Sequence, residues 1–152
     1  MTDAVRDTPA ADPVGFRLNF FKLVVRDLDA ARRFYTRAFG LVQQGDDVVM
    51  PGLREAMLAR PGDRFTLVLY QHTDGREITL GSAYGPVGFL TRNLDAALAH
   101  VVAEGATCGR GPLDLPGMKV AFVFDPEGHE IELIQMASRA GPGAQPSQEQ
   151  PQ

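Results

Sequence analysis

A six-residue pattern occurs twice in the chain and constrains its fold more than any other feature. Residues 26–31 read RDLDAA and residues 92–97 read RNLDAA, so five of the six positions are identical at an offset of 66 residues. Each copy follows a short apolar run, and each copy opens a segment with helical periodicity. Self-similarity at a fixed offset is typical of a fold built from repeated structural units. We therefore predict two modules of the same architecture.

Both copies predict an amphipathic α-helix, because apolar residues recur at positions i, i+3, i+4 and i+7 and share one helix face. The two apolar stripes consist of Ala31, Phe34, Tyr35 and Ala38, and of Leu94, Ala97, Leu98 and Val101. Aspartate and asparagine favour the first position before a helix, since their side chains accept hydrogen bonds from free backbone amides. Asp27 or Asp29 can cap the first helix, and Asn93 or Asp95 can cap the second.

Strand-like segments flank each predicted helix. Apolar runs precede the helices at 20–25 and 87–90, and β-rich segments follow at 46–50, 54–60, 65–72, 106–110, 118–124 and 130–136. Each module therefore has the element order βαβββ. We predict an α+β fold in which the two modules form one curved mixed sheet around a concave cavity, with the helices outside. Such a cavity suits a small ligand.

The composition of the two ends predicts the domain boundaries. Residues 1–15 are polar, and residues 138–152 are rich in Pro, Gly and Gln. Segments of this kind bury too little apolar surface to offset the entropy lost on ordering, so we expect disordered tails. A single domain is expected at 16–137, with module one at about 16–75 and module two at about 82–137.

Charge and composition exclude several partners. The chain of 152 residues has a formal net charge of −4, which disfavours nucleic-acid binding because that binding depends on clustered Lys and Arg. No apolar run approaches the ~20 residues needed to span a membrane, and the first residues lack the pattern of a secretory signal. The single cysteine, Cys108, fits a reducing compartment. We expect a cytoplasmic protein that binds neither nucleic acid nor membranes.

Three segments carry a resemblance to a known superfamily. They are KLVVRDLDAARRFYTRAFGL at 22–41, LGSAYGPVGFLTRNLDAALA at 80–99 and FDPEGHEIELIQ at 124–135. They resemble the vicinal oxygen chelate superfamily, which includes glyoxalase I, extradiol dioxygenases, fosfomycin-resistance proteins and bleomycin-binding proteins. The second segment is especially similar to bacterial glyoxalase I. The resemblance covers roughly residues 18–136, and it implies the paired βαβββ fold and a homodimer.

The resemblance also implies four metal-ligand positions on the concave sheet. These positions are occupied here by Phe20, Val68, Pro86 and Glu132. Only Glu132 carries a metal-binding atom, whereas a catalytic zinc usually has three protein ligands. We therefore expect no metal ion and no other cofactor, which argues against metal-dependent glyoxalase I chemistry. A metal bound by Glu132 with residues from unexpected positions, such as His72, stays as a third possibility.

The alternation of side chains along strands predicts which residues line the cavity. The predicted ligand-binding residues are Phe20, Thr66, Val68, Pro86, Leu90 and Ile134. The predicted catalytic residues are Glu132, Lys22 and Tyr70. This mixture of apolar and polar groups suits a compact, partly apolar organic ligand.

The function that we favour is a metal-independent isomerase, epimerase or lyase acting on a small carbonyl-containing or aromatic metabolite. Glu132 would serve as the general base, while Lys22 or Tyr70 would stabilise developing negative charge. Glu132 could instead be a relic, or form a structural ion pair with Lys22. The alternative function is that of a bleomycin-resistance-type protein, which sequesters a ligand without catalysis.

Overall fold

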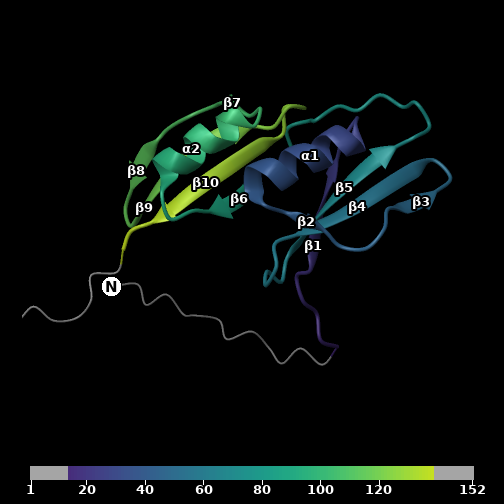
Figure 1. Ribbon diagram of the computed structural model, residues 1–152, viewed down its shortest axis with the longest axis horizontal. Helices are drawn as coiled ribbons and strands as arrows, with labels where there is room; N and C mark the ends of the chain where they lie inside the picture. Colours follow the sequence, from purple (N-terminus) through teal and green to yellow (C-terminus); the bar gives the residue numbers. More distant parts are fainter. Residues whose placement is uncertain (1–13, 139–152) are drawn as a thin grey trace, which may run out of the picture. The chain divides into compact units, whose positions relative to one another are not determined.

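The computed structural model describes residues 14–138 (Figure 1). The predicted tails at 1–15 and 138–152 lie almost entirely outside the described residues. The chain divides into two compact units, unit 1 at Met1–Ile78 and unit 2 at Thr79–Gln152. The division falls between the two predicted modules, and each unit has its own helix, sheet and core.

The described part of unit 1, from residue 14 onward, contains one helix and one five-stranded sheet. Its elements are β1 (Phe20–Val24), α1 (Leu28–Phe39), β2 (Val42–Gln43), β3 (Val48–Met50), β4 (Leu53–Ala59) and β5 (Thr66–His72). The strand order is β1-β5-β4-β2, and β3 also pairs with β4. The β1–β5 pair is parallel, and the other pairs are antiparallel. Because β2 and β3 both pair with β4, they form one interrupted strand, which preserves the predicted βαβββ order.

Unit 2 repeats this plan. Its elements are β6 (Val87–Leu90), α2 (Leu94–Ala103), β7 (Thr107–Cys108), β8 (Leu113–Leu115), β9 (Met118–Phe124) and β10 (Glu130–Met136). The strand order is β6-β10-β9-β7, and β8 also pairs with β9. The α+β class and the modular plan are confirmed. The expected single sheet is replaced by two five-stranded sheets among the described strands, because each ladder joins strands of the same module.

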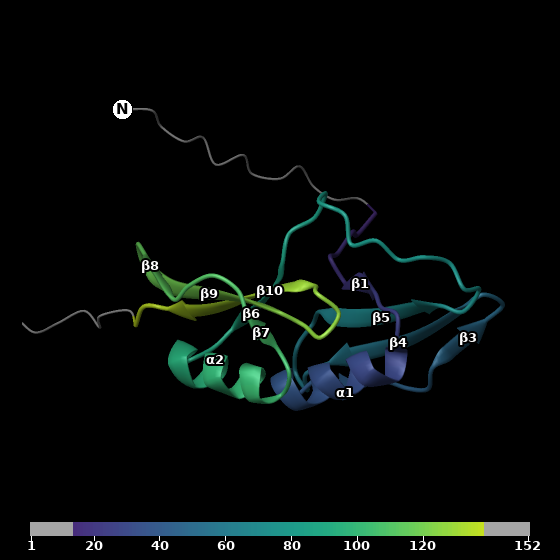
Figure 2. The same cartoon turned by 90° about the horizontal axis from the view of Figure 1, so that it is seen from above.

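Each helix packs on one face of the sheet in its own unit. Helix α1 contacts β4 and β5, and helix α2 contacts β9 and β10 (Figure 2). The predicted stripe of α1 is buried throughout, at Ala31, Phe34, Tyr35 and Ala38. In α2 the stripe is buried at Leu94 and Val101, whereas Ala97 and Leu98 between them are half-buried. Within the described residues 14–138, no helix of the same unit lies on the other face of each sheet, and we call this face the open face.

Of the two capping residues predicted for each helix, one forms the cap in the structure. The Asp27 carboxylate accepts a hydrogen bond from the Ala30 amide at 2.9 Å. The Asn93 side-chain oxygen accepts one from the Ala96 amide at 3.0 Å. Both caps satisfy backbone amides that have no partner inside the helix.

A glutamine from the last strand of each module provides a second cap. Gln71 on β5 accepts a hydrogen bond from the Leu28 amide at 3.1 Å, through its side-chain oxygen. Gln135 on β10 accepts one from the Leu94 amide in the same way, at 2.7 Å. Each glutamine therefore ties the start of a helix to the central strand beneath it. The sequence patterns did not predict this contact, because it joins residues 43 and 41 positions apart.

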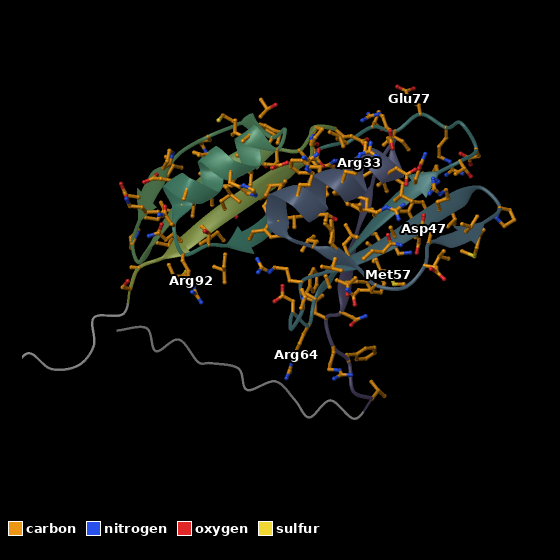
Figure 3. All side chains as sticks on the ribbon, in the orientation of Figure 1. Arg33, Asp47, Met57, Arg64, Glu77 and Arg92 are labelled. Atoms are coloured by element: carbon orange, nitrogen blue, oxygen red, sulfur yellow. The ribbon has the colours of Figure 1, made fainter. Side chains whose placement is uncertain are left out.

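A network of charges joins α1 to β4 beside the interrupted strand of unit 1. The Asp47 carboxylate, labelled in Figure 3, accepts hydrogen bonds from Arg32 and from Arg54, both at 2.9 Å. Arg32 also donates to Asp29 at 2.7 Å. The hydrogen bond from Arg32 is the main reason that the pKa of Asp47 lies below its ordinary value.

Candidate functional site

The open face of unit 1 contains the predicted residues of the first module. The strand register places Phe20 opposite Thr66, and Lys22 opposite Val68. Tyr70 lies two residues beyond Val68 on β5, and therefore points to the same face. The register thus agrees with the predicted alternation, which placed these side chains on the same face of the sheet. The role of these side chains in ligand binding stays a prediction.

Two further side chains on this face come from β4 and were missed. The register places Met57 opposite Val68, and Glu55 opposite Tyr70. β4 carries none of the metal positions that the resemblance implies, so the parity argument from those positions did not extend to it. The signal that could have found Glu55 was the alternation of β4 itself, in which Ala56 and Leu58 are buried on the opposite face.

Lys22 and Glu55 form an ion pair that crosses the central strand of unit 1. Lys22 lies on β1 and Glu55 on β4, while β5 runs between these strands. The lysine stem must therefore pass over β5, near its register partner Val68. Val68 is only 4% exposed, so it forms a covered floor beneath the pair.

Aromatic rings flank the Lys22 ammonium group. Its nitrogen lies 5.3 Å from the centre of the Tyr70 ring and 5.9 Å from the centre of the Phe20 ring. A cation within about 6 Å of an aromatic face is attracted by the ring's quadrupole. The Tyr70 ring in turn meets the edge of His72, with ring centres 4.8 Å apart. Lys22 is thus held by one carboxylate and two rings.

The open face of unit 2 has the same strand arrangement as that of unit 1, but it carries different side chains. The register places Glu132, in the middle of β10, between Gly88 on β6 and Phe122 on β9. The next row on this face contains Leu90 and Ile134. Pro86 directly precedes β6, and Leu90 is 75% exposed.

Three residues that lie side by side on neighbouring strands form a row across each open face, and the corresponding rows of the two units differ in whether the charged side chain has an ionic partner. In unit 1 the row is Lys22–Val68–Met57, and in unit 2 it is Gly88–Glu132–Phe122. Gly88 therefore occupies the place of Lys22, and it has no side chain that could cross β10. Among residues 14–138, no basic side chain pairs with the Glu132 carboxylate. Glu132 is half-buried, and the alternative of an ion pair with Lys22 is not observed, because Lys22 pairs with Glu55.

Arg110 is a third residue near the open faces that the sequence patterns did not predict. It lies between β7 and β8, and its guanidinium carbon is 4.6 Å from the centre of the Phe122 ring. The flanking glycines allow this segment to approach β9 closely, since a Cβ at Gly109 would lie 2.8 Å from the Phe122 carbonyl oxygen. Arg110 is therefore an exposed cation close to the row that contains Glu132.

The buried histidine of unit 2 has a structural partner. His129 and Asp125 are 3% and 4% exposed, and the His129 Nδ1 atom lies 2.9 Å from an Asp125 carboxylate oxygen. Asp125 also accepts hydrogen bonds from the backbone amides of Glu127 and His129. This pattern defines the turn between β9 and β10, and it places His129 away from the open face.

The side chains at the four positions implied by the resemblance do not fit a transition-metal site. Phe20, Val68 and Pro86 carry hydrocarbon side chains without a lone pair, so Glu132 is the single donor of the four. Glu55 on unit 1 is an additional carboxylate, but it is already paired with Lys22. Across residues 14–138, no three His, Cys, Asp or Glu side chains are grouped so that they could hold one metal ion.

Comparisons with curated proteins find lactoylglutathione lyases. The chain is 29% identical over 126 residues to a lactoylglutathione lyase from Arabidopsis thaliana, a match that covers 80% of this chain and 44% of the plant protein. The chain thus spans less than half the length of this relative. In the part of the chain that the structure describes, no helix has the length and apolar character needed to cross a membrane.

Solved structures with the same fold include an enzyme and a binding protein. A glyoxalase I variant from Zea mays matches with a TM-score of 0.67 and 28% identity, covering 77% of this chain and 45% of the maize chain. An antibiotic-binding protein from Streptomyces sp. CB03234 matches with a TM-score of 0.66 and 23% identity, covering 82% of this chain and 98% of that chain. At 23% identity the second likeness shows the fold alone.

A family model accounts for most of the described chain. The match extends over residues 17–133, which include both copies of the repeat and the positions of Phe20, Val68, Pro86 and Glu132. The same βαβββ plan occurs in each unit, as the resemblance implied. The chain belongs to the Glyoxalase/Bleomycin resistance protein/Dioxygenase superfamily and is a glyoxalase-like protein.

Proposed function

We propose that this glyoxalase-like protein binds a small, partly apolar carbonyl compound and moves a proton on it without a metal ion. Glu132 is the general base. Its carboxylate accepts a proton from the carbon next to the carbonyl group, and the electron pair of the broken C–H bond moves onto the carbonyl oxygen. The electron pair returns as the proton is added to the opposite face of the same carbon. Where that carbon carries a hydroxyl group, the proton can instead be added to the former carbonyl carbon, while the hydroxyl proton moves to the former carbonyl oxygen and the new C=O bond forms. This balance describes an isomerase or an epimerase and needs no redox partner.

One observation carries this proposal: Glu132 is half-buried on the open face of unit 2 beside Gly88, and no basic side chain among residues 14–138 neutralises its carboxylate. A base must remain available to the substrate, and the missing side chain of Gly88 leaves space beside it. Arg110 is the nearby cation that could attract a negatively charged oxygen. The predicted charge-stabilising residues Lys22 and Tyr70 belong to unit 1.

Metal independence is supported by the donor chemistry at the superfamily positions. A Lewis-acid mechanism would need several ligands around one ion, and three of the four implied positions carry hydrocarbon side chains. A carboxylate can abstract a proton next to a carbonyl group without a metal when the developing charge is stabilised by hydrogen bonds or cations.

The experiment measures proton exchange directly. S-lactoylglutathione, the compound named in the Arabidopsis relative, is incubated with the protein in D₂O after treatment with a chelator. Loss of the lactoyl methine signal in the ¹H NMR spectrum reports exchange at the carbon next to the carbonyl. We expect exchange by the natural protein and a loss of about a hundredfold or more in Glu132→Gln, in the range of a general base's contribution.

Glu130→Gln is the matched control, because Glu130 lies on the same strand and the same face, opposite Phe124. This variant should retain exchange. Exchange that disappears with the chelator and returns with a divalent ion would contradict metal independence. Equal activity of Glu132→Gln and the natural protein would remove Glu132 as the base.

A second candidate is sequestration of a ligand without catalysis. The observation that favours it is the apolar surroundings of the two open faces, where Phe20 and Leu90 are 49% and 75% exposed. The fold match to an antibiotic-binding protein is consistent with such a role. Tight binding of a ligand, with no exchange and no product, would favour sequestration over the enzyme.

The homodimer and the cytoplasmic location remain part of the proposal. Light scattering coupled to size-exclusion chromatography tests the first, since a dimer has twice the chain mass of 16.5 kDa. Fractionation of the source cells tests the second.

A further inference from the structure

The Lys22 ammonium group has binding capacity that the fold does not use. An ammonium group has three N–H donors, and its hydrogen-bond partner within residues 14–138 is the Glu55 carboxylate alone. The side chain of Lys22 is 41% exposed, whereas that of Glu55 is 13% exposed. The Glu55 carboxylate is therefore mostly covered, whereas the Lys22 ammonium group remains accessible from the open face.

The surroundings of this ammonium group define the shape of a partner. The Phe20 ring is 49% exposed, and the Tyr70 ring is half-buried beside it. Both rings lie within 6 Å of the Lys22 nitrogen. A ligand that reaches the ammonium group must therefore pass along aromatic surface. A flat apolar group would contact the rings, and an anionic group would reach the free N–H donors.

We propose that Lys22 is an anion-binding residue on the open face of unit 1, and that its ligand is an aromatic or similarly flat apolar monocarboxylate. Glu55 is a positioning residue, since it holds the ammonium group over β5 and does not itself contact the ligand. This inference goes beyond the proposed function. It concerns binding to unit 1 alone, and therefore does not depend on proton transfer by Glu132.

The composition of the chain makes the proposal simple to test. Lys22 and Lys119 are its two lysines, against 13 arginines. Labelling of the lysine side-chain nitrogen with ¹⁵N therefore produces two ammonium signals in an NMR spectrum, one from each unit. Lys119 is on β9, and its side chain is 54% exposed, near Asp114. It serves as the internal reference.

The probes are naphthalene-2-carboxylate and the uncharged naphthalene-2-carboxamide, which have the same ring and nearly the same size. We expect the carboxylate to move the Lys22 signal, to leave the Lys119 signal in place, and to bind about fivefold more tightly than the amide, as for one partly exposed ion pair. Lys22→Met should abolish this preference, and Lys119→Met should retain it. Lys22→Arg should restore most of it, because the charge is kept.

Glu55→Gln separates positioning from direct contact. It removes the negative charge that competes with the ligand, so the preference for the carboxylate should increase, while the Lys22 signal becomes broader as the ammonium group loses its anchor. The proposal is overturned if neither probe binds, if the natural protein does not prefer the carboxylate, or if Lys22→Met keeps the preference. The D₂O exchange assay with Glu132→Gln would still decide the proposed function in each of these cases.

Discussion

Replacement of Gln135 by methionine should loosen the start of α2 from β10. Methionine has nearly the same length and volume as glutamine, so packing is retained while the acceptor of the 2.7 Å hydrogen bond from the Leu94 amide is lost. Leu94 is 1% exposed, and its amide belongs to the first turn, where no intrahelical acceptor exists. A net hydrogen bond contributes about 1 kcal/mol, and an unsatisfied buried donor costs about 1–3 kcal/mol. Because Gln135 is half-buried and water can partly replace it, we expect a loss of about 1.5 kcal/mol in the free energy of unfolding.

Two measurements check this value. Urea unfolding followed by circular dichroism gives the change in stability, and hydrogen exchange of the Leu94 amide should accelerate by about tenfold, since 1.4 kcal/mol corresponds to that factor. Gln135→Glu is the matched control, because it keeps an acceptor and places a negative charge at a helix N-terminus, worth about 0.3–1 kcal/mol. Its stability at pH 7 should equal or exceed that of the natural protein. If the Glu and Met variants lose the same stability, or if Leu94 exchange is unchanged in the Met variant, the assigned role of this hydrogen bond is wrong.

Three further predictions concern unit 1 and the turn regions. The lowered pKa of Asp47 means that its ionised form stabilises the folded protein. Asp47→Asn should therefore be less stable than the natural protein at pH 7. This difference in the free energy of unfolding should shrink as the pH falls below the unfolded pKa of 3.8 towards the lower folded value, and urea unfolding at a series of pH values measures it. Asp27→Ala removes the N-cap of α1 and should lower the free energy of unfolding by about 1 kcal/mol, whereas Asp27→Ser should keep most of it in the same assay. Gly109→Ala places a Cβ 2.8 Å from the Phe122 carbonyl oxygen and should lower the melting temperature, while Gly85→Ala, where nothing lies within 4 Å, should leave it nearly unchanged.

Local patterns were sufficient for the helices and for most strands. The stripe of α1 is buried as predicted because helical periodicity is a property of one segment alone. The stripe of α2 is buried at Leu94 and Val101, whereas Ala97 and Leu98 are half-buried. The caps were narrowed to Asp27 and Asn93 by hydrogen bonds that the sequence permits but does not distinguish from the alternatives.

For the candidate site, the sequence predicts which face of the sheet a side chain lies on, but not which side chains contact one another. Alternation along β1 and β5 was enough to put Lys22 and Tyr70 on one face. The partner of Lys22 is Glu55, 33 residues away, and it depends on the registers of two strand pairs at once. Arg110 was missed for a similar reason, because its place over Phe122 depends on how an irregular segment approaches β9. Contacts of this kind have no sequence periodicity to reveal them.

The parallel pairing of first and last strands makes each module indivisible. Phe20 pairs with Thr66, and Val87 pairs with Ile131. The first strand of each module can therefore form its ladder only after almost the whole module has been synthesised. A fragment that ends before β5, or before β10 in unit 2, leaves the first strand of its module without its parallel partner. The offset of 66 residues between the two copies of the repeat is therefore about the length of one complete βαβββ module.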